Sequence, residues 1–189
     1  EEYEAYLNRR TAIALHHFGK IWLEQTSRYV HPFQLYGNVW YVGDSWVCVH
    51  LIDTGDGLLL IDSGNCGATA MLVQAIWEAG FNPADVKWII HSHGHVDHIG
   101  GANFFKEMYG TQLYLGEPDA RMFREKPEIS AIYDSHCDLD ALFVPDYEIK
   151  DGDVLTFGNT VIHCVMVPGH TDGCVALFFD AHNGGEVKR

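Results

Sequence analysis

The stretch from Val86 to Gly101, VKWIIHSHGHVDHIGG, constrains this chain most, because four of the twelve histidines and an aspartate directly follow an apolar strand. In an extended segment, residues i and i+2 point the same way, so His93 and His95 can converge on one ion. The chain then turns into a helix, where Asp97 and His98 can face a second position. Imidazole and carboxylate groups are ligands that zinc prefers, and burying them together without a metal would be costly. The stretch therefore predicts a metal site.

A tetrahedral metal site needs a further ligand from a distant part of the chain. The segment VMVPGHTDGC offers one, because an apolar strand is followed by a Pro-Gly turn and then by His170. The turn fixes the backbone and exposes the imidazole. We therefore expect His170 to join His93 and His95 at the first ion.

The charge of the chain excludes several kinds of partner. Lys and Arg number 12 against 26 Asp and Glu, which gives a net charge of −14. Such an acidic balance opposes binding to the phosphates of nucleic acids and to anionic lipid. No run approaches the ~20 apolar residues that a membrane-spanning helix needs. A small-molecule substrate is the expected partner, with no nucleic acid and no membrane.

The cysteines and the first residue bear on the compartment. Five cysteines are scattered without a Cys-x-x-Cys, a pattern that predicts free thiols. The chain begins with Glu1 rather than Met, so two locations stay open. The protein is periplasmic or secreted if a signal peptide has been removed, and cytoplasmic otherwise.

Hydrophobic periodicity divides the chain into an extension and one domain. A helical pattern over residues 3–25 predicts an N-terminal helical extension, residues 1–30, and residues 31–189 are expected to form the domain. Further helices are predicted at 68–80, 101–110 and 117–126. Helices alternate with strands in the first half and hairpins dominate the second, so both parallel and antiparallel pairing are expected.

The histidine motif carries a specific family resemblance. The motif HGHVDH, preceded by Asp62 at the end of the strand LLLIDSG and followed by His170 in PGHT, resembles the metallo-β-lactamase superfamily over about residues 34–189. The likeness is greatest to subclass B3 enzymes, through SHGHVDHIGG, YEIKDGDVLTFGNTVIHC, PGHTDGCVALFF and DAHNGGEVKR. The resemblance implies a mixed α/β (α+β) domain built as an αββα sandwich, with two packed sheets, helices outside and metals at one sheet edge.

The resemblance also implies a role for each residue of the motif. Two Zn²⁺ ions would be bound, the first by His93, His95 and His170 and the second in part by Asp97 and His98. A water or hydroxide bridging the ions would be the nucleophile, because metal binding lowers the pKa of water toward ~7. Asp97 would be the catalytic residue that orients it.

Asp62 would stand behind the ligands and hydrogen-bond the metal loop, although an aspartate at this place is also common in ordinary turns. Asp172 departs from the family, which usually has proline there. Family members draw further active-site residues from beyond the last strand present here, and no motif before Arg189 matches them. We therefore expect the C-terminal part of the fold to be lacking, the second zinc to be incompletely coordinated, and a C-terminal fragment to be a candidate partner.

Residues 117–146 could form a wall of the substrate cleft, with a plain surface loop as an equal alternative. The candidate substrate contacts are Tyr133, Phe143, His50 and His136. His91 lies on the strand before the motif, where alternation favours packing at the strand end over binding metal.

Several activities fit this resemblance, since one fold supports many reactions. The first is a zinc hydrolase in which a metal-bound hydroxide attacks the carbonyl of a cyclic amide such as a β-lactam, an activity that would connect the protein with antibiotic resistance. The second is a lactonase or a glyoxalase II-like thioesterase. An iron-dependent dioxygenase of the same fold, and a fold that binds metal without turnover, are further alternatives. The oligomeric state stays open.

Overall fold

The protein is described by a computed structural model that covers residues 3–6, 8–9, 25–130 and 141–189. Residues 3–6 and 8–9 are helical, while most of the predicted N-terminal extension lies outside the described residues. The division of the chain at residue 30 stays a prediction.

A seven-stranded sheet forms the centre of the domain, with its strands in the order β1 to β7. The strands are β1 (Phe33–Tyr36), β2 (Val39–Tyr41), β3 (His50–Asp53), β4 (Leu58–Ile61), β5 (Val86–Ile90), β6 (Gln112–Gly116) and β7 (Tyr147–Ile149). Strands β1 to β4 pair antiparallel and β4 to β7 pair in parallel, so both expected kinds of pairing occur. The continuous apolar runs of β4 and β5 suit central strands that are covered on both faces.

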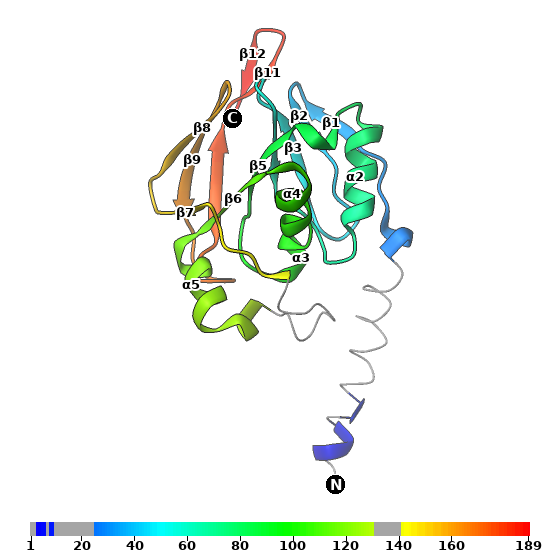
Figure 1. Ribbon diagram of the computed structural model, residues 1–189, viewed down its shortest axis with the longest axis vertical. Coiled ribbons are helices and arrows are strands. Elements are labelled where there is room, and N and C mark those ends of the chain that lie inside the picture. Colours follow the sequence, from blue (N-terminus) through cyan, green and yellow to red (C-terminus); the bar gives the residue numbers. More distant parts are fainter. Residues whose placement is uncertain (1–2, 7, 10–24, 131–140) are drawn as a thin grey trace.

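Helices cover one face of this sheet, as Figure 1 shows for α2 and α4. The helical segments are η1 (Gln25–Arg28), α2 (Thr69–Glu78), η2 (Pro83–Asp85), α3 (Val96–Ile99), α4 (Ala102–Tyr109), α5 (Glu117–Glu125) and η3 (Pro127–Ser130). Ile76 of α2 and Phe105 of α4 are fully buried in one cluster with Leu60 and Ile89 of the sheet. The three helices predicted in the domain are thus present as α2, α4 and α5.

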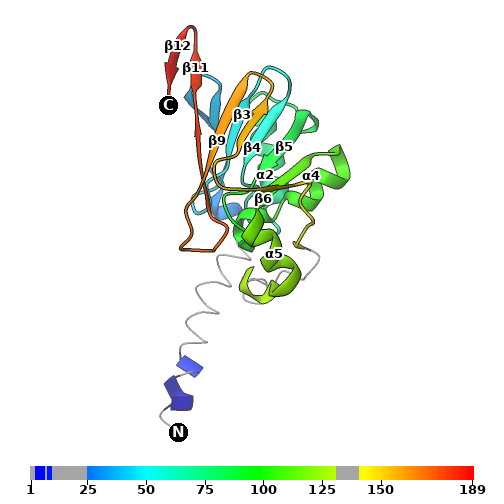
Figure 2. The ribbon, with the colours of Figure 1, turned by 90° about the vertical axis from the view of Figure 1, so that its left-hand side faces the viewer.

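A smaller sheet packs against the other face. It contains β8 (Val154–Phe157), β9 (Thr160–Met166) and β10 (Val175–Phe179), all antiparallel, and a hairpin of β11 (Ala181–Asn183) and β12 (Glu186–Lys188) follows. Leu59 and Ile90 of the large sheet share a buried cluster with Phe157 and Ile162 of the small one. Figure 2 shows β9 standing against β3, β4 and β5.

The layers therefore run from helices to the large sheet to the small sheet. This mixed α/β arrangement agrees with the expected metallo-β-lactamase fold. In the described parts of the chain no helix covers the outer face of the small sheet, where Val161, Val165 and Phe178 are 44%, 40% and 50% exposed. The outer helical layer implied by the resemblance is not formed by these residues.

Two further observations concern single features of the chain. Cys66 is disulfide-bonded, so the expectation of free thiols is wrong for this cysteine, while Cys48, Cys164 and Cys174 are free. Among the described helices, none combines the length and apolar character needed to cross a membrane.

Candidate metal centre

Parallel strands deliver the candidate site residues to one edge of the large sheet. β4 is followed by Asp62, β5 by the histidine motif, and β6 by the first turn of α5. Because carboxyl ends of neighbouring parallel strands meet at the same edge, residues that are distant in sequence come together there. The bulky apolar residues of β4 and β5 anchor both strands in the core, so the polar residues that follow them start from fixed points.

The first group of candidate ligands consists of His93, His95 and His170, whose ligand atoms lie within 4.8 Å of one another. Nδ1 of His95 is 2.9 Å from Nε2 of His170. Zinc holds imidazole nitrogens at about 2.0–2.1 Å, which places two ligands of one ion roughly 3–4 Å apart. Small side-chain movements therefore suffice for these three imidazoles to bind one ion.

The second group consists of His93, Asp97 and His98, again within 4.8 Å. Asp97 and His98 lie in the short helix α3, and Nε2 of His98 is 3.7 Å from Oδ2 of Asp97. The structure thus assigns His93 to both groups by distance, whereas the sequence analysis placed it at the first ion alone.

His93 is the residue whose environment best fits a metal. Its Nδ1 is 3.1 Å from Oγ of Ser92, and its buried Nε2 has no hydrogen-bond partner among the described residues. A buried polar atom without a partner is costly, and an ion at this position would satisfy it. Because only Nε2 is free, His93 can serve one ion at a time.

The charge states of His93 and His95 also suit metal binding. Burial, followed by the neighbouring His98, lowers the pKa of His93 to about 3. Burial and the nearby His170 lower the pKa of His95 as well. Both imidazoles are therefore neutral at pH 7, and neutral histidine is the form that coordinates metal.

Asp62 is a buried carboxylate that fixes the second group. Its Oδ1 accepts from the Ser92 N–H at 2.7 Å, and its Oδ2 accepts from the Ser92 hydroxyl and from Nδ1 of His98, both at 2.8 Å. An ionised carboxylate only accepts hydrogen bonds, so Nδ1 of His98 carries the proton and its Nε2 faces Asp97. Asp62 also has a positive φ of 64°, a conformation that aspartate adopts more readily than most residues.

The Asp62–His98 pair shifts both pKa values. Burial alone would raise the pKa of Asp62, but the hydrogen bond and charge of His98 and the Ser92 N–H outweigh it, and the pKa lies below its ordinary value. Burial would lower the pKa of His98, but the hydrogen bond and charge of Asp62 raise it above its ordinary value. The second group is thus held by the hydrogen-bonded pair of Asp62 and His98, each of which favours the charged form of the other.

The loop that carries His170 is tied back to the motif. The Val175 N–H at the start of β10 donates to the carbonyl oxygen of Ser92 at 2.9 Å. Within the loop, the Gly169 N–H donates to the Thr171 carbonyl oxygen at 3.0 Å. Asp172, which replaces the usual proline, is exposed.

Of the expected substrate contacts, only His50 and Phe143 lie in the described part of the chain; Tyr133 and His136 lie outside it. His50 is half-buried at the start of β3, 5.8 Å from the ring of Tyr41, and burial lowers its pKa. Phe143 is 6% exposed and belongs to the core cluster on the helical face. This corrects its expected position, because the ring packs inside the domain instead of facing a cleft.

His91 is fully buried and lies outside both groups. Its Nε2 is 3.2 Å from the Ser63 hydroxyl and its Nδ1 is 3.1 Å from the Tyr114 carbonyl oxygen. The centroid of its ring lies 4.8 Å from that of Phe143, with the two rings tilted by 39°. With both nitrogens engaged, His91 packs at the strand end as expected.

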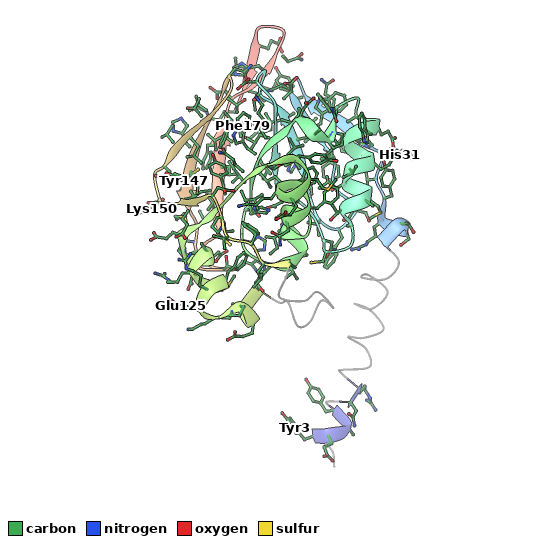
Figure 3. All side chains as sticks on the ribbon, viewed as in Figure 1. Tyr3, His31, Glu125, Tyr147, Lys150 and Phe179 are labelled. Atoms are coloured by element: carbon green, nitrogen blue, oxygen red, sulfur yellow. The ribbon has the colours of Figure 1, made fainter. Side chains whose placement is uncertain are left out.

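A hollow of about 220 Å³ adjoins the first group between α5 and the His170 loop. His170 and Asp172 line one side, and Arg121, Glu125 and Lys126 of the α5 region line the other. Figure 3 labels Glu125, which projects outward at the end of α5.

One residue of the site was missed by the sequence analysis. Asp119, in the first turn of α5, is fully buried, and its carboxylate accepts hydrogen bonds from the loop that carries His95 and from the loop that carries His170. The only signal for it was an aspartate shortly after the strand TQLYLG, and such a residue is ordinarily explained by the favourable helix dipole.

Comparison with known proteins identifies relatives of several activities. The family model described as the metallo-beta-lactamase superfamily matches residues 47–183. Hydroxyacylglutathione hydrolase GloC of Haemophilus influenzae is 30% identical over 132 residues, which are 69% of this chain and 59% of that protein. An N-acyl homoserine lactonase of Bacillus thuringiensis is 30% identical over 118 residues, covering 61% of this chain and 42% of the lactonase.

Solved structures with a similar fold include metallo-beta-lactamases. GOB-18 from Elizabethkingia meningoseptica superposes with a TM-score of 0.77 at 26% identity, over 85% of this chain and 59% of its own. BJP-1 of Bradyrhizobium japonicum, a subclass B3 enzyme, gives 0.75 at 33% identity over 85% and 60%. The chain thus spans roughly two fifths to three fifths of the relatives it matches.

Proposed function

The chain belongs to the metallo-beta-lactamase superfamily, whose members are hydrolytic enzymes, and on that premise we propose that it is a zinc-dependent hydrolase of a cyclic amide, with a β-lactam as the first candidate substrate. The observation that carries this proposal is the meeting of His93, His95 and His170 around a buried nitrogen that lacks a partner. When bound, zinc lowers the pKa of a coordinated water and polarises the carbonyl of the substrate.

We assign the roles of the ligands from their contacts. His93, His95 and His170 would hold the first ion as neutral imidazoles. Asp97 and His98 would face the second ion, which lacks a third ligand once Nε2 of His93 serves the first. We therefore expect one tightly held zinc and a second that is incompletely coordinated by the described residues.

Asp97 and Asp62 would have different tasks. The side chain of Asp97 is partly exposed, so water can reach its carboxylate. As the catalytic residue, Asp97 would accept a hydrogen bond from the attacking water and orient it. Asp62 is buried behind His98 and would hold that imidazole with Nε2 facing outward, the usual work of a carboxylate behind a histidine ligand.

A second candidate is hydrolysis of a lactone or a thioester. It is supported by the lactonase and the hydroxyacylglutathione hydrolase, each 30% identical to this chain. The β-lactam is placed first because the metallo-beta-lactamase structures match 85% of the chain. An iron-dependent dioxygenase of the same fold is the least supported alternative.

A substrate panel with elemental analysis separates these candidates. The purified protein is loaded with zinc and assayed on nitrocefin, an N-acyl homoserine lactone and S-lactoylglutathione, with metal-free protein as control. We expect zinc-dependent turnover of nitrocefin. Turnover of only the lactone or the thioester would favour the second candidate, and binding of zinc without any turnover would contradict a hydrolase. Iron in the protein as isolated would contradict the zinc assignment.

We further propose that the protein works in an oxidising compartment, which favours the periplasmic or secreted alternative. Cys66 is disulfide-bonded, and disulfides persist outside the reducing cytosol. Alkylation of protein isolated without reductant should leave Cys66 unmodified, whereas labelling of Cys66 would contradict this location.

A further inference from the structure

Asp119 connects the two segments that carry the first group of histidines. Its Oδ2 accepts from the Gly94 N–H at 2.7 Å, between His93 and His95. The same oxygen accepts from the Thr171 hydroxyl at 2.7 Å, and Oδ1 accepts from the Gly173 N–H at 2.9 Å. One carboxylate is therefore bonded to the chain on both sides of the candidate metal position.

The packing around Asp119 leaves little freedom. A Cβ added to Gly173 would lie 2.5 Å from Cγ of Asp119, and one added to Gly116 would lie 2.3 Å from the Gly173 carbonyl oxygen. A Cβ on Gly94 would lie 2.8 Å from the ring of Phe123. Backbone approaches this close exist only because these positions are glycine, so the two loops and α5 form one tightly fitted unit.

The chemistry of the contacts requires a carboxylate. Asp119 is 0% exposed, and burying a charge is costly unless hydrogen bonds compensate for it. All three partners are donors, and an ionised carboxylate accepts at both oxygens. An asparagine of the same shape would turn one acceptor into an NH₂ donor facing an N–H or a hydroxyl.

We propose that Asp119 is a positioning residue that fixes the loop of His93 and His95 relative to the loop of His170, so that the three imidazoles meet on one metal ion. Asp62 does not do this, because its hydrogen-bond partners Ser92 and His98 belong to the motif segment alone. The inference rests on the proposed zinc function, since it concerns how that site is held together.

The matched control for Asp119 is Asp44. Asp44 is 8% exposed and accepts from two backbone N–H groups, those of Trp46 and Val47, each at 2.7 Å. It lies in the turn between β2 and β3 and belongs to neither ligand group. Its Oδ2 also lies 3.9 Å from Nη1 of Arg28. Asp44→Asn therefore makes the same chemical change at a buried, hydrogen-bonded aspartate away from the metal residues.

The test measures zinc affinity and folding separately. Zinc dissociation constants of the wild type, D119N and D44N are measured by competition with a chelator, and melting temperatures of the metal-free proteins are recorded. Loss of a group that orients metal ligands typically weakens binding 10–100-fold. We expect a rise of about 10-fold or more in the dissociation constant of D119N, a changed absorption spectrum of its cobalt form, and wild-type affinity in D44N.

Thr171→Val is the second variant, because it removes one donor to Asp119 with little change in shape. If D119N does not fold, a weakened zinc affinity in T171V supports the proposal and an unchanged affinity contradicts it. Unchanged affinity in D119N, with a melting temperature lowered as in D44N, would show a purely structural role. Failure of the wild type to bind zinc would instead overturn the proposed function.

Discussion

The two groups of candidate ligands share His93 but are built differently. The first draws His95 and His170 from segments 75 positions apart, and burial lowers the pKa values of His93 and His95. The second adds Asp97 and His98 from one short helix, and the buried carboxylate of Asp62 supports it through a hydrogen bond to His98. The first group therefore depends on tertiary packing, and the second on local helix geometry and charge.

Removal of His170 should have the largest effect. His170→Ala deletes one of the two ligands that belong to the first group alone, and we expect zinc affinity to fall more than about 100-fold, beyond the range for loss of a supporting residue. Hydrolysis should be lost with it. Chelator competition and elemental analysis measure the effect.

The matched control is His163→Ala, an exposed histidine on β9 outside both groups. It should bind zinc as the wild type does. If H170A retained a zinc ion at wild-type affinity, the second group, and not the first, would be the tighter zinc site.

Asp62→Asn should weaken the second group selectively. Asparagine tolerates the positive φ at this position but cannot accept hydrogen bonds at both atoms, so His98 loses its fixed orientation. We expect the second, weaker zinc to bind about 10–100-fold less tightly, with a smaller change at the first. Stepwise titration of metal-free protein resolves the two ions.

Asp53→Asn serves as its control, since Asp53 is an exposed aspartate at the end of β3 that accepts from the Gly55 N–H. It should leave both binding steps unchanged. Equal weakening of both steps in D62N would show that Asp62 supports the whole motif and not the second group.

The pH dependence of the metal-free protein should show the smallest effect. Burial lowers the pKa of His91 to about 4, so below pH ~6.5 the unfolded chain binds a proton that the folded chain does not. The stability that neutral His91 contributes is therefore present above pH ~6.5 and is lost as pH falls, by about 1 kcal/mol between pH 7.5 and 5.5. His93 and His95 shift in the same direction.

His98 shifts oppositely. Its pKa is raised, so the stability from its pairing with Asp62 is fully present below pH ~6.5 and is lost as pH rises through its folded value. Denaturant unfolding at several pH values measures the balance, and His91→Gln should flatten the curve on the acid side. If His91→Gln left the pH dependence of stability between 7.5 and 5.5 unchanged, the neutral state of buried His91 would be contradicted.

The sequence predicted the local parts of this molecule better than the distant ones. The apolar run before the motif and the i, i+2 spacing of His93 and His95 fix their geometry within a few residues. The helices in the domain follow from their periodicity. The position of His170 followed from its turn and from the family resemblance, because no local rule states which distant loop completes a metal site.

The failures have physical causes of the same kind. Phe143 is one aromatic in a segment without clear periodicity, and only the packing on Phe123 and His91 decides that it is buried. Asp119 has an ordinary place in a first helical turn, and its importance arises from donors in two other loops. The sharing of His93 depends on distances that spacing alone cannot give.

The separation of the histidines in the first group also bears on folding kinetics. Contacts between residues far apart in sequence close large loops and tend to form late. The zinc site needs both loops in place, so we expect it to form only after the folding transition state. Interactions missing from the transition state chiefly slow unfolding, so bound zinc should lengthen the lifetime of the folded protein while leaving its folding rate nearly unchanged.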